Sequence, residues 1–146
     1  MTHTTRMLTA IGLIFLGALT NAVAQAPAAK RVTTSSGVYT TQQAAEGEQT
    51  YMNICVACHP PGTYTAPAFR DKWNGAPLSD LFGLISHTMP KQEPASLEPQ
   101  EYAAVVAYML KINGAPSGKK PLPADANALK RIQISMPSKA APVGKS

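Results

Sequence analysis

The chain of 146 residues has little charge, few aromatic side chains and only two cysteines. Charged residues make up 14% and the formal net charge is +5, with no dense basic cluster, so the electrostatic footprint of a nucleic-acid-binding protein is missing. Aromatic residues make up 6%, so a core built from side chains alone would be thin. No segment alternates convincingly as a strand would and no internal repeat is visible, which favours a small helical domain.

The first 24 residues have the layout of a secretory signal peptide. Arg6 precedes an apolar run over 7–19, and the tripeptide Ala22–Ala24 fits the small-x-small cleavage rule. The run is too short for a comfortable membrane span. We therefore expect an exported protein of the bacterial periplasm that starts near Gln25 and has no membrane span after cleavage; the alternative is an uncleaved N-terminal anchor.

Several kinds of site could use Cys55 and Cys58. A disulfide between them would close a tiny loop and stabilise the fold little. A zinc site needs four ligands, and no second Cys/His pair stands at ligand spacing. A thioredoxin-like redox motif follows a strand in a βαβ unit, whereas the flanks of these cysteines look helical.

The five residues Cys55–His59 form the pattern Cys-x-x-Cys-His, the attachment signature for c-type haem. Two thiols at this spacing can each add to one vinyl group of the same porphyrin, and the histidine can donate its imidazole nitrogen to the iron. The sequence therefore predicts one haem c, bound covalently through Cys55 and Cys58, with His59 as proximal ligand.

A second axial ligand would come from one of four methionines beyond the signal peptide. Met52 is too close in sequence to the attachment turn, Met109 lies in an amphipathic pattern and Met136 lies in a basic tail. Met89 follows a predicted helix and precedes a proline, so it falls in an ordered turn and is the predicted ligand. His87 is the rival, and its ordinary interpretation is an exposed histidine at a helix end.

Three helices are expected. The first covers 41–55, capped by Thr40 or Thr41, with Gly47 and Tyr51 on one face. The second begins near Leu78, with Ser79 as a candidate cap. Its inward-facing residues are expected to be Leu81, Leu84 and Ile85.

The third helix has the clearest pattern. Ser96 is a candidate cap, Pro99 falls in the first turn and Gly114 ends the helix. Its apolar stripe is expected to consist of Tyr102, Val105, Val106, Met109 and Leu110. The segment 60–77 has too many Pro and Gly for regular structure and is expected to form an Ω-like loop over the haem.

Together these features resemble class I cytochrome c over about Gln42 to Gly114. The resemblance implies an all-α fold in which three to four helices wrap around one covalently attached haem, with long irregular loops. It also implies a close crossing between the first and last helices, in which Gly47 and Tyr51 meet Tyr108.

The same resemblance implies two further site residues. Pro67 is similar to the family proline whose carbonyl accepts a hydrogen bond from the proximal imidazole, with Pro60 and Pro61 as rivals. Trp73 is similar to the residue that hydrogen-bonds a haem propionate, although a place in the pocket wall is an equal alternative.

The segment from Met89 onward also resembles cytochrome domains and subunits that accompany periplasmic quinoprotein dehydrogenases. This implies redox partner proteins: a dehydrogenase as donor, and an oxidase or another cytochrome as acceptor. A haem with histidine and methionine ligands has no open position for a substrate, which predicts a single-electron carrier of the respiratory chain and no enzyme. The alternatives are a permanent electron-transfer subunit of a dehydrogenase complex, and a haem enzyme with an open or labile distal iron position.

The chain is thus divided into a signal peptide (1–24), a flexible lead-in (25–40), a cytochrome c domain (41–114) and a partly disordered extension (115–146). Within the extension, 121–134 could form a short helix that packs on the domain through Leu129 and Ile132. The small, basic residues 135–146 are expected to be disordered.

Overall fold

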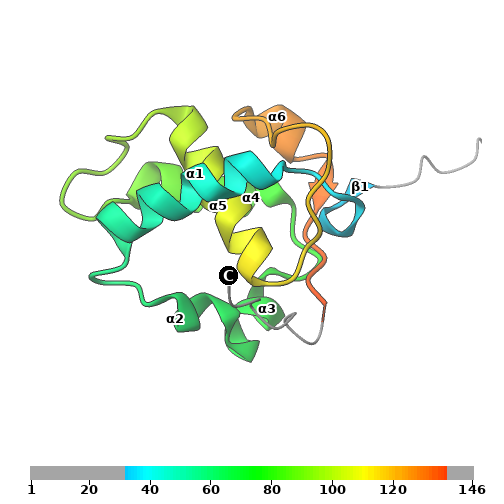
Figure 1. The fold of residues 1–146 in the computed structure, drawn as a ribbon, viewed down its shortest axis with the longest axis horizontal. Coiled ribbons are helices and arrows are strands. Elements are labelled where there is room, and N and C mark those ends of the chain that lie inside the picture. Colours follow the sequence, from blue (N-terminus) through cyan, green and yellow to red (C-terminus); the bar gives the residue numbers. More distant parts are fainter. Residues whose placement is uncertain (1–31, 138–146) are drawn as a thin grey trace, which may run out of the picture.

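The computed structural model describes residues 32–137, and Figure 1 shows their arrangement. The predicted signal peptide, the first part of the lead-in and the end of the tail lie outside these residues. The elements are β1 (Val32–Thr33), a 3-10 turn (Thr34–Ser36), α1 (Thr41–Thr50), a π-helical segment (Tyr51–Cys55), α2 (Pro61–Thr65), α3 (Pro67–Trp73), α4 (Leu78–Thr88), α5 (Pro99–Ile112), α6 (Ala126–Leu129) and β2 (Ile132–Gln133). The fold is all-α, as predicted, apart from the two short strands. None of the helices in 32–137 has the length and apolar character that a membrane crossing requires.

Helix α5 lies at the centre of the fold. Nine consecutive residues, from Tyr102 to Leu110, are buried, and a helix that is covered on every side belongs in the middle of a core. The five residues of the predicted apolar stripe are all buried, as expected, but the buried surface of the helix extends beyond that stripe. Pro99 is the first residue of the helix, as expected, and Gly114 follows its end with φ +79°. The predicted cap was wrong: Glu98 caps the helix, in a reciprocal pair with Glu101.

Helix α1 crosses α5 at close range, which confirms the contact that the family resemblance implied (Figure 1). A β-carbon on Gly47 would overlap the backbone of Ala104 in α5. One turn later the rings of Tyr51 and Tyr108 lie 5.1 Å apart. Thr40 caps α1 by accepting a hydrogen bond of 3.1 Å from the Gln43 amide, as predicted.

Helix α4 begins at Leu78, and two predictions for it were wrong. Pro77 occupies the cap position, while the Ser79 hydroxyl donates to the Asp80 carboxylate and accepts no hydrogen bond from a backbone amide of α4. Leu81 faces the core at 1% exposure, as predicted, but Leu84 is 46% exposed. Ile85 is half-buried, so the inward face of α4 is narrower than the periodicity indicated.

The segment expected to be an irregular loop contains two short helices, α2 and α3. Each begins with a proline, Pro61 and Pro67, at its first position. A proline there loses no helical hydrogen bond, and its fixed φ suits the helix. Ala66 is extended and separates the two helices. The density of prolines therefore marked helix starts, and the expectation of a loop without regular structure was wrong.

Residues 32–40, expected to be flexible, are packed onto the domain. Thr34 is fully buried and Tyr39 is 2% exposed. The Tyr39 hydroxyl donates a hydrogen bond of 2.5 Å to the carbonyl of Ala115. The lead-in is therefore part of the folded unit from residue 32 onward.

The C-terminal extension is also part of the core through residue 136. Leu129 of α6 is fully buried, as predicted, and Ile132 is half-buried. Met136 was expected to lie in a disordered tail, but its side chain is buried. The strands β1 and β2 pair in parallel, Val32 beside Ile132, so the two ends of the described chain meet.

Candidate haem site

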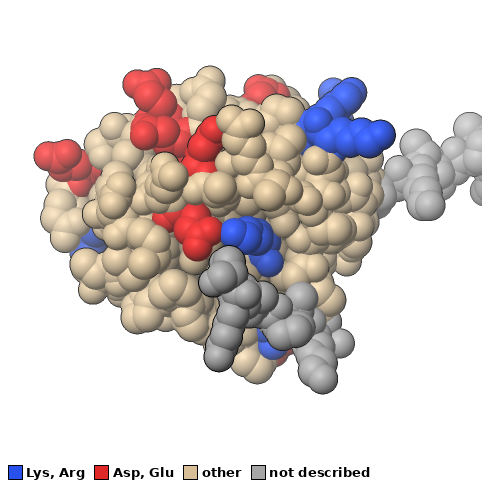
Figure 2. Space-filling model, viewed as in Figure 1, with Lys and Arg blue, Asp and Glu red and all other residues tan. Residues whose placement is uncertain are grey.

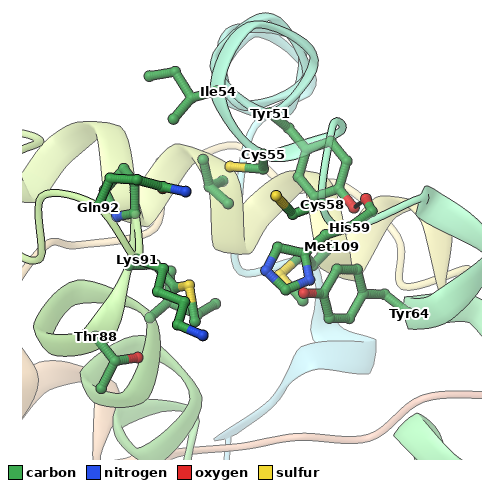
Figure 3. A pocket seen from close by; sticks show the side chains of 14 residues that line it. Tyr51, Ile54, Cys55, Cys58, His59, Tyr64, Thr88, Lys91, Gln92 and Met109 are labelled. Carbon is green, nitrogen blue, oxygen red and sulfur yellow. Dashed lines mark hydrogen bonds between the residues drawn. The ribbon is translucent and has the colours of Figure 1, made fainter.

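A cavity of about 640 Å³ lies between the turn that carries both cysteines and the loop that follows α4 (Figure 3). Its volume falls in the range of roughly 300–1,000 Å³ that is usual for cofactor and ligand sites. Much of its lining is apolar and comes from Ile54, Ile85, Val105 and Met109. The cavity therefore suits a large hydrophobic group.

Cys55, Cys58 and His59 all line this cavity, and Figure 3 shows their side chains in it. The π-helical segment brings them there. In it the Val56 amide donates a hydrogen bond of 3.0 Å to the Tyr51 carbonyl five residues earlier, so this turn holds one residue more than an α-helical turn. The amides of Cys58 and His59 then both bond the Cys55 carbonyl, at 3.2 and 2.9 Å. This tight turn places two thiols and one imidazole at the same wall.

No disulfide joins the two cysteines, and Cys58 is exposed while Cys55 is half-buried. Burial raises the pKa of the Cys55 thiol above its ordinary value. No group of three or more His, Cys, Asp or Glu side chains in the described part of the chain is arranged to hold a metal ion. The thiols are thus available for bonds to another group, and the geometry gives no support to a zinc site.

Two tyrosines hold the segment that contains His59. The Tyr51 hydroxyl donates a hydrogen bond to the His59 carbonyl, and the ring of Tyr64 lies 5.8 Å from the imidazole. Tyr51 and Tyr64 also contact each other, with 6.2 Å between ring centroids. Tyr64 was not identified from the sequence, since it follows His59 in a segment without periodicity and only the fold brings the two rings together.

Met89 lies on the other side of the cavity, where α4 ends. In Figure 3 its neighbours Thr88 and Lys91 lie across the cavity from Cys58. The Met89 amide donates a hydrogen bond of 3.0 Å to the Ile85 carbonyl, and the Met89 carbonyl accepts a hydrogen bond of 2.6 Å from the Tyr102 hydroxyl. Hydrogen bonds therefore hold both the amide and the carbonyl of Met89.

The structure narrows the choice among the methionines. Met89 and Met109 line the cavity, whereas Met52 is 51% exposed and Met136 is buried elsewhere, and neither lines it. Met109 lies in the buried face of α5, as expected of a core residue. Met89 is the methionine that combines a place at the cavity with a position in a loop.

The rival ligand His87 lies outside the cavity. Its side chain is exposed, and its Nδ1 atom is 2.8 Å from the Gly83 carbonyl oxygen one turn earlier in α4. This is the position of an exposed histidine at a helix end, which was its ordinary interpretation.

Trp73 lines a second cavity of about 220 Å³ that adjoins the first, because Tyr64, Ile85, Thr88, Met89 and Met109 line both. Its ring is 8% exposed, lies 6.3 Å from that of Phe69 and has the Lys72 Nζ atom 5.1 Å from its centroid. Trp73 therefore lies in the cavity wall, and a bond to a haem propionate stays a prediction.

Pro67 is exposed at the start of α3 and lines neither cavity. Among the hydrogen bonds within residues 32–137, none joins its carbonyl to His59. Its role as acceptor for the proximal imidazole therefore also stays a prediction.

The residues around the cavity fit a c-type haem. Two thiols can form thioethers, an imidazole and a thioether can ligate iron, and apolar side chains can surround the porphyrin. The backbone of His59 is held by the hydrogen bond from Tyr51, so the residue is fixed at the cavity.

Comparison with known protein families agrees with this chemistry. Residues 42–109 match the family described as cytochrome C oxidase, cbb3-type, subunit III. The matched segment contains the attachment turn, α2, α3, α4 and most of α1 and α5. No curated protein and no solved structure gives a match to the chain.

Proposed function

Because residues 42–109 form a class I c-type cytochrome domain with one covalently bound haem c, we propose that the protein is a periplasmic single-electron carrier. In this proposal the haem is attached through Cys55 and Cys58 and has His59 and Met89 as axial ligands. The observation that carries it is the placement of the attachment turn and the Met89 loop on two sides of one apolar cavity.

When bound, the haem supplies a one-electron iron couple. The chain's own residues would then have three tasks: His59 and Met89 would supply the two ligands, the apolar lining would exclude water, and the neighbouring residues would hold the ligands in place. With two protein ligands on the iron, neither O₂ nor a substrate would bind it, and outer-sphere electron transfer would be the chemistry that remains. A thioether ligand also raises the reduction potential relative to a second histidine.

The position of His87 weighs against a haem enzyme. Such an enzyme needs an acid–base side chain next to an open iron position. His87 was the candidate from the sequence, and it is exposed outside the cavity with Nδ1 next to the Gly83 carbonyl. We therefore favour an electron carrier.

The mouth of the cavity indicates the kind of partner. Lys91 lines the first cavity (Figure 3) and Lys72 lines the adjoining one, while no acidic residue lines either. On the face in Figure 2, acidic side chains gather toward the left and basic ones lie mainly toward the right. At the cavities themselves the two lysines attract a partner of negative charge. We propose an acidic docking surface on a dehydrogenase as donor, and an oxidase or another cytochrome as acceptor.

Exposed apolar side chains near the cavity support a second possibility, a permanent subunit of a dehydrogenase complex. Ile54 and Leu84 are 42% and 46% exposed and line the two cavities. Copurification from periplasm at low and at high salt separates the two forms. A transient carrier dissociates from its partner at high salt, whereas a permanent subunit with an apolar interface does not.

The ligand proposal is tested by absorption spectra of the oxidised and reduced protein, with an alkaline pyridine haemochrome assay. We expect a c-type haemochrome and the weak far-red band of methionine-bound ferric iron. Met89→Ala should lose this band and lower the reduction potential, whereas Met109→Leu and His87→Ala should retain the band. If Met109→Leu loses it and Met89→Ala does not, the assignment is wrong. The absence of covalent haem would refute the whole function.

A further inference from the structure

The last described residues of the chain contact the connection that leads out of Trp73. Residues 132–136, here called the C-terminal strap, lie along residues 74–77, which join α3 to α4. The Gly75 amide donates to the Ile134 carbonyl, and the Ile134 amide donates to the Ala76 carbonyl, both at 2.9 Å. The strap therefore pairs with this connection as a neighbouring strand would.

Side chains strengthen this pairing. The Asn74 carboxamide oxygen accepts a hydrogen bond of 2.7 Å from the Met136 amide. The nitrogen of the same carboxamide lies 3.5 Å from the Met136 carbonyl oxygen. The Gln133 carboxamide donates to the Gly75 carbonyl at 2.9 Å. Every one of residues 74–76 is therefore bonded to the strap.

The strap is itself fixed from two directions. Ile134 and Met136 are 1% and 5% exposed, so their side chains are anchored in the core. On its other edge the strap pairs with β1, and the Thr34 hydroxyl both donates to the Ser135 carbonyl and accepts from the Ser135 amide, each at 2.8 Å. The strap is held firmly enough to position what it contacts.

The connection at 74–77 has few other constraints. Its remaining backbone hydrogen bonds in the described residues are local: the Asn74 amide donates to Arg70, the Ala76 amide donates to Trp73, and the Pro77 carbonyl accepts from the Asp80 amide. Trp73 immediately precedes this connection, and α4, which Met89 follows directly in the chain, begins immediately after it. The strap therefore fixes the segment that joins two walls of the second cavity.

We propose that the C-terminal strap is a positioning element for the haem site, which holds Trp73 against the cavity and keeps α4 where Met89 can reach the iron. The part that concerns Met89 rests on the proposed function. The strap contacts neither cavity, so it acts through the 74–77 connection. It also lies beyond the segment that matches the cytochrome family.

The test compares two shortened chains and one substitution, each with its haem attached. A chain that ends after Arg131 lacks the strap, and a chain that ends after Pro137 keeps it. In the full chain, Asn74→Ala removes both side-chain contacts to Met136. If the chain that ends after Arg131 does not fold, the test is decided by this substitution. Ser79→Ala is its control, because that exposed hydroxyl bonds only the Asp80 carboxylate next to it.

Two readings are taken from each protein. Trp73 is the only tryptophan, so its emission, which haem at short distance quenches, reports its position. The far-red band reports methionine ligation. Loss of the strap and Asn74→Ala should raise Trp73 emission several-fold and weaken the band, while the chain ending at Pro137 and Ser79→Ala match the wild type.

Unchanged emission and an unchanged band in a folded Asn74→Ala variant would overturn the proposal. Increased emission with a full band would overturn the part that concerns Met89. If the wild type itself has no far-red band, the ligand assignment under the proposed function has failed, and the emission of Trp73 still tests the strap separately.

Discussion

Gly47 of α1 packs directly on the backbone of Ala104 in α5, with no room between them for a β-carbon. This contact fixes the distance between the two helices that carry much of the core. Tyr51, one turn after Gly47 and at the start of the π-helical segment, can then lie on Tyr108 and reach the carbonyl of His59 with its hydroxyl. The crossing of two helices thus sets the position of the attachment turn.

Gly47→Ala should destabilise the protein by about 3 kcal/mol, because the added methyl group forces two backbones apart and overpacking on this scale is costly. Denaturant unfolding of the haem-loaded protein measures the loss. Gly62→Ala is the matched control, since a β-carbon at Gly62 meets nothing within 4 Å, and it should change the free energy of unfolding by less than about 0.5 kcal/mol. Equal stability of the two variants would contradict the close contact.

Tyr102→Phe should cost about 1–2 kcal/mol, because the Tyr102 hydroxyl donates to the Met89 carbonyl and accepts from the Leu97 amide at 3.3 Å. Hydrogen exchange at the Leu97 amide should also accelerate. Tyr108→Phe is a control in the same helix, since the Tyr108 hydroxyl makes no hydrogen bond within the described residues. If both variants lose the same stability, the hydroxyl of Tyr102 does not hold the Met89 loop.

Thr40→Ala should lower the free energy of unfolding by about 1 kcal/mol, the usual effect of removing a helix cap. Ser79→Ala and Ser96→Ala should each change it by less than about 0.5 kcal/mol, because neither side chain caps a helix. Thermal unfolding of the three variants gives the comparison. A loss at Ser96 as large as that at Thr40 would restore the cap that the sequence indicated for α5.

Alkaline pH should destabilise the fold through Tyr39. Burial raises the pKa of this phenol above its ordinary value of about 10. The unfolded chain therefore loses the proton first. Stability from this group is complete below about pH 10 and falls as the pH rises toward the folded-state pKa, by up to about 1.4 kcal/mol per pH unit.

Tyr39→Phe provides the check, with unfolding measured by far-ultraviolet circular dichroism between pH 8 and about 11. The variant should be less stable than the wild type at pH 8, because it loses the hydrogen bond to Ala115. It should lose less further stability as the pH rises. Parallel curves for the two proteins would show that Tyr39 does not ionise differently in the folded state.

Much of the site could be predicted because its chemistry is local in sequence. The attachment motif Cys55–His59 is contiguous, and the position of Met89 at a helix end before a proline marks an ordered loop. Both now lie at one cavity. Tyr64 and Tyr102 could not be recognised as site residues, since their contacts to His59 and Met89 arise only when separate helices pack.

Errors in the fold have two physical causes. Pro61 and Pro67 were interpreted as breakers, although a proline at the first position of a helix favours its start. Residues 132–133 form strand β2, where the sequence indicated the end of a short helix. Residues 32–40 and 135–136 have no periodicity, so these segments resembled flexible ends. Their order comes from pairing with each other and from burial of Tyr39 and Ile134, which neither segment can achieve alone.

The pairing of Thr34 with Ser135 also has a kinetic consequence. The two residues are 101 positions apart, and a contact that closes so long a loop is among the slowest to form in a folding chain. The backbone hydrogen bonds of the attachment turn, by contrast, join residues at most five positions apart. The thiols can therefore be in place for reaction with the haem before the C-terminal strap pairs with the connection that follows Trp73.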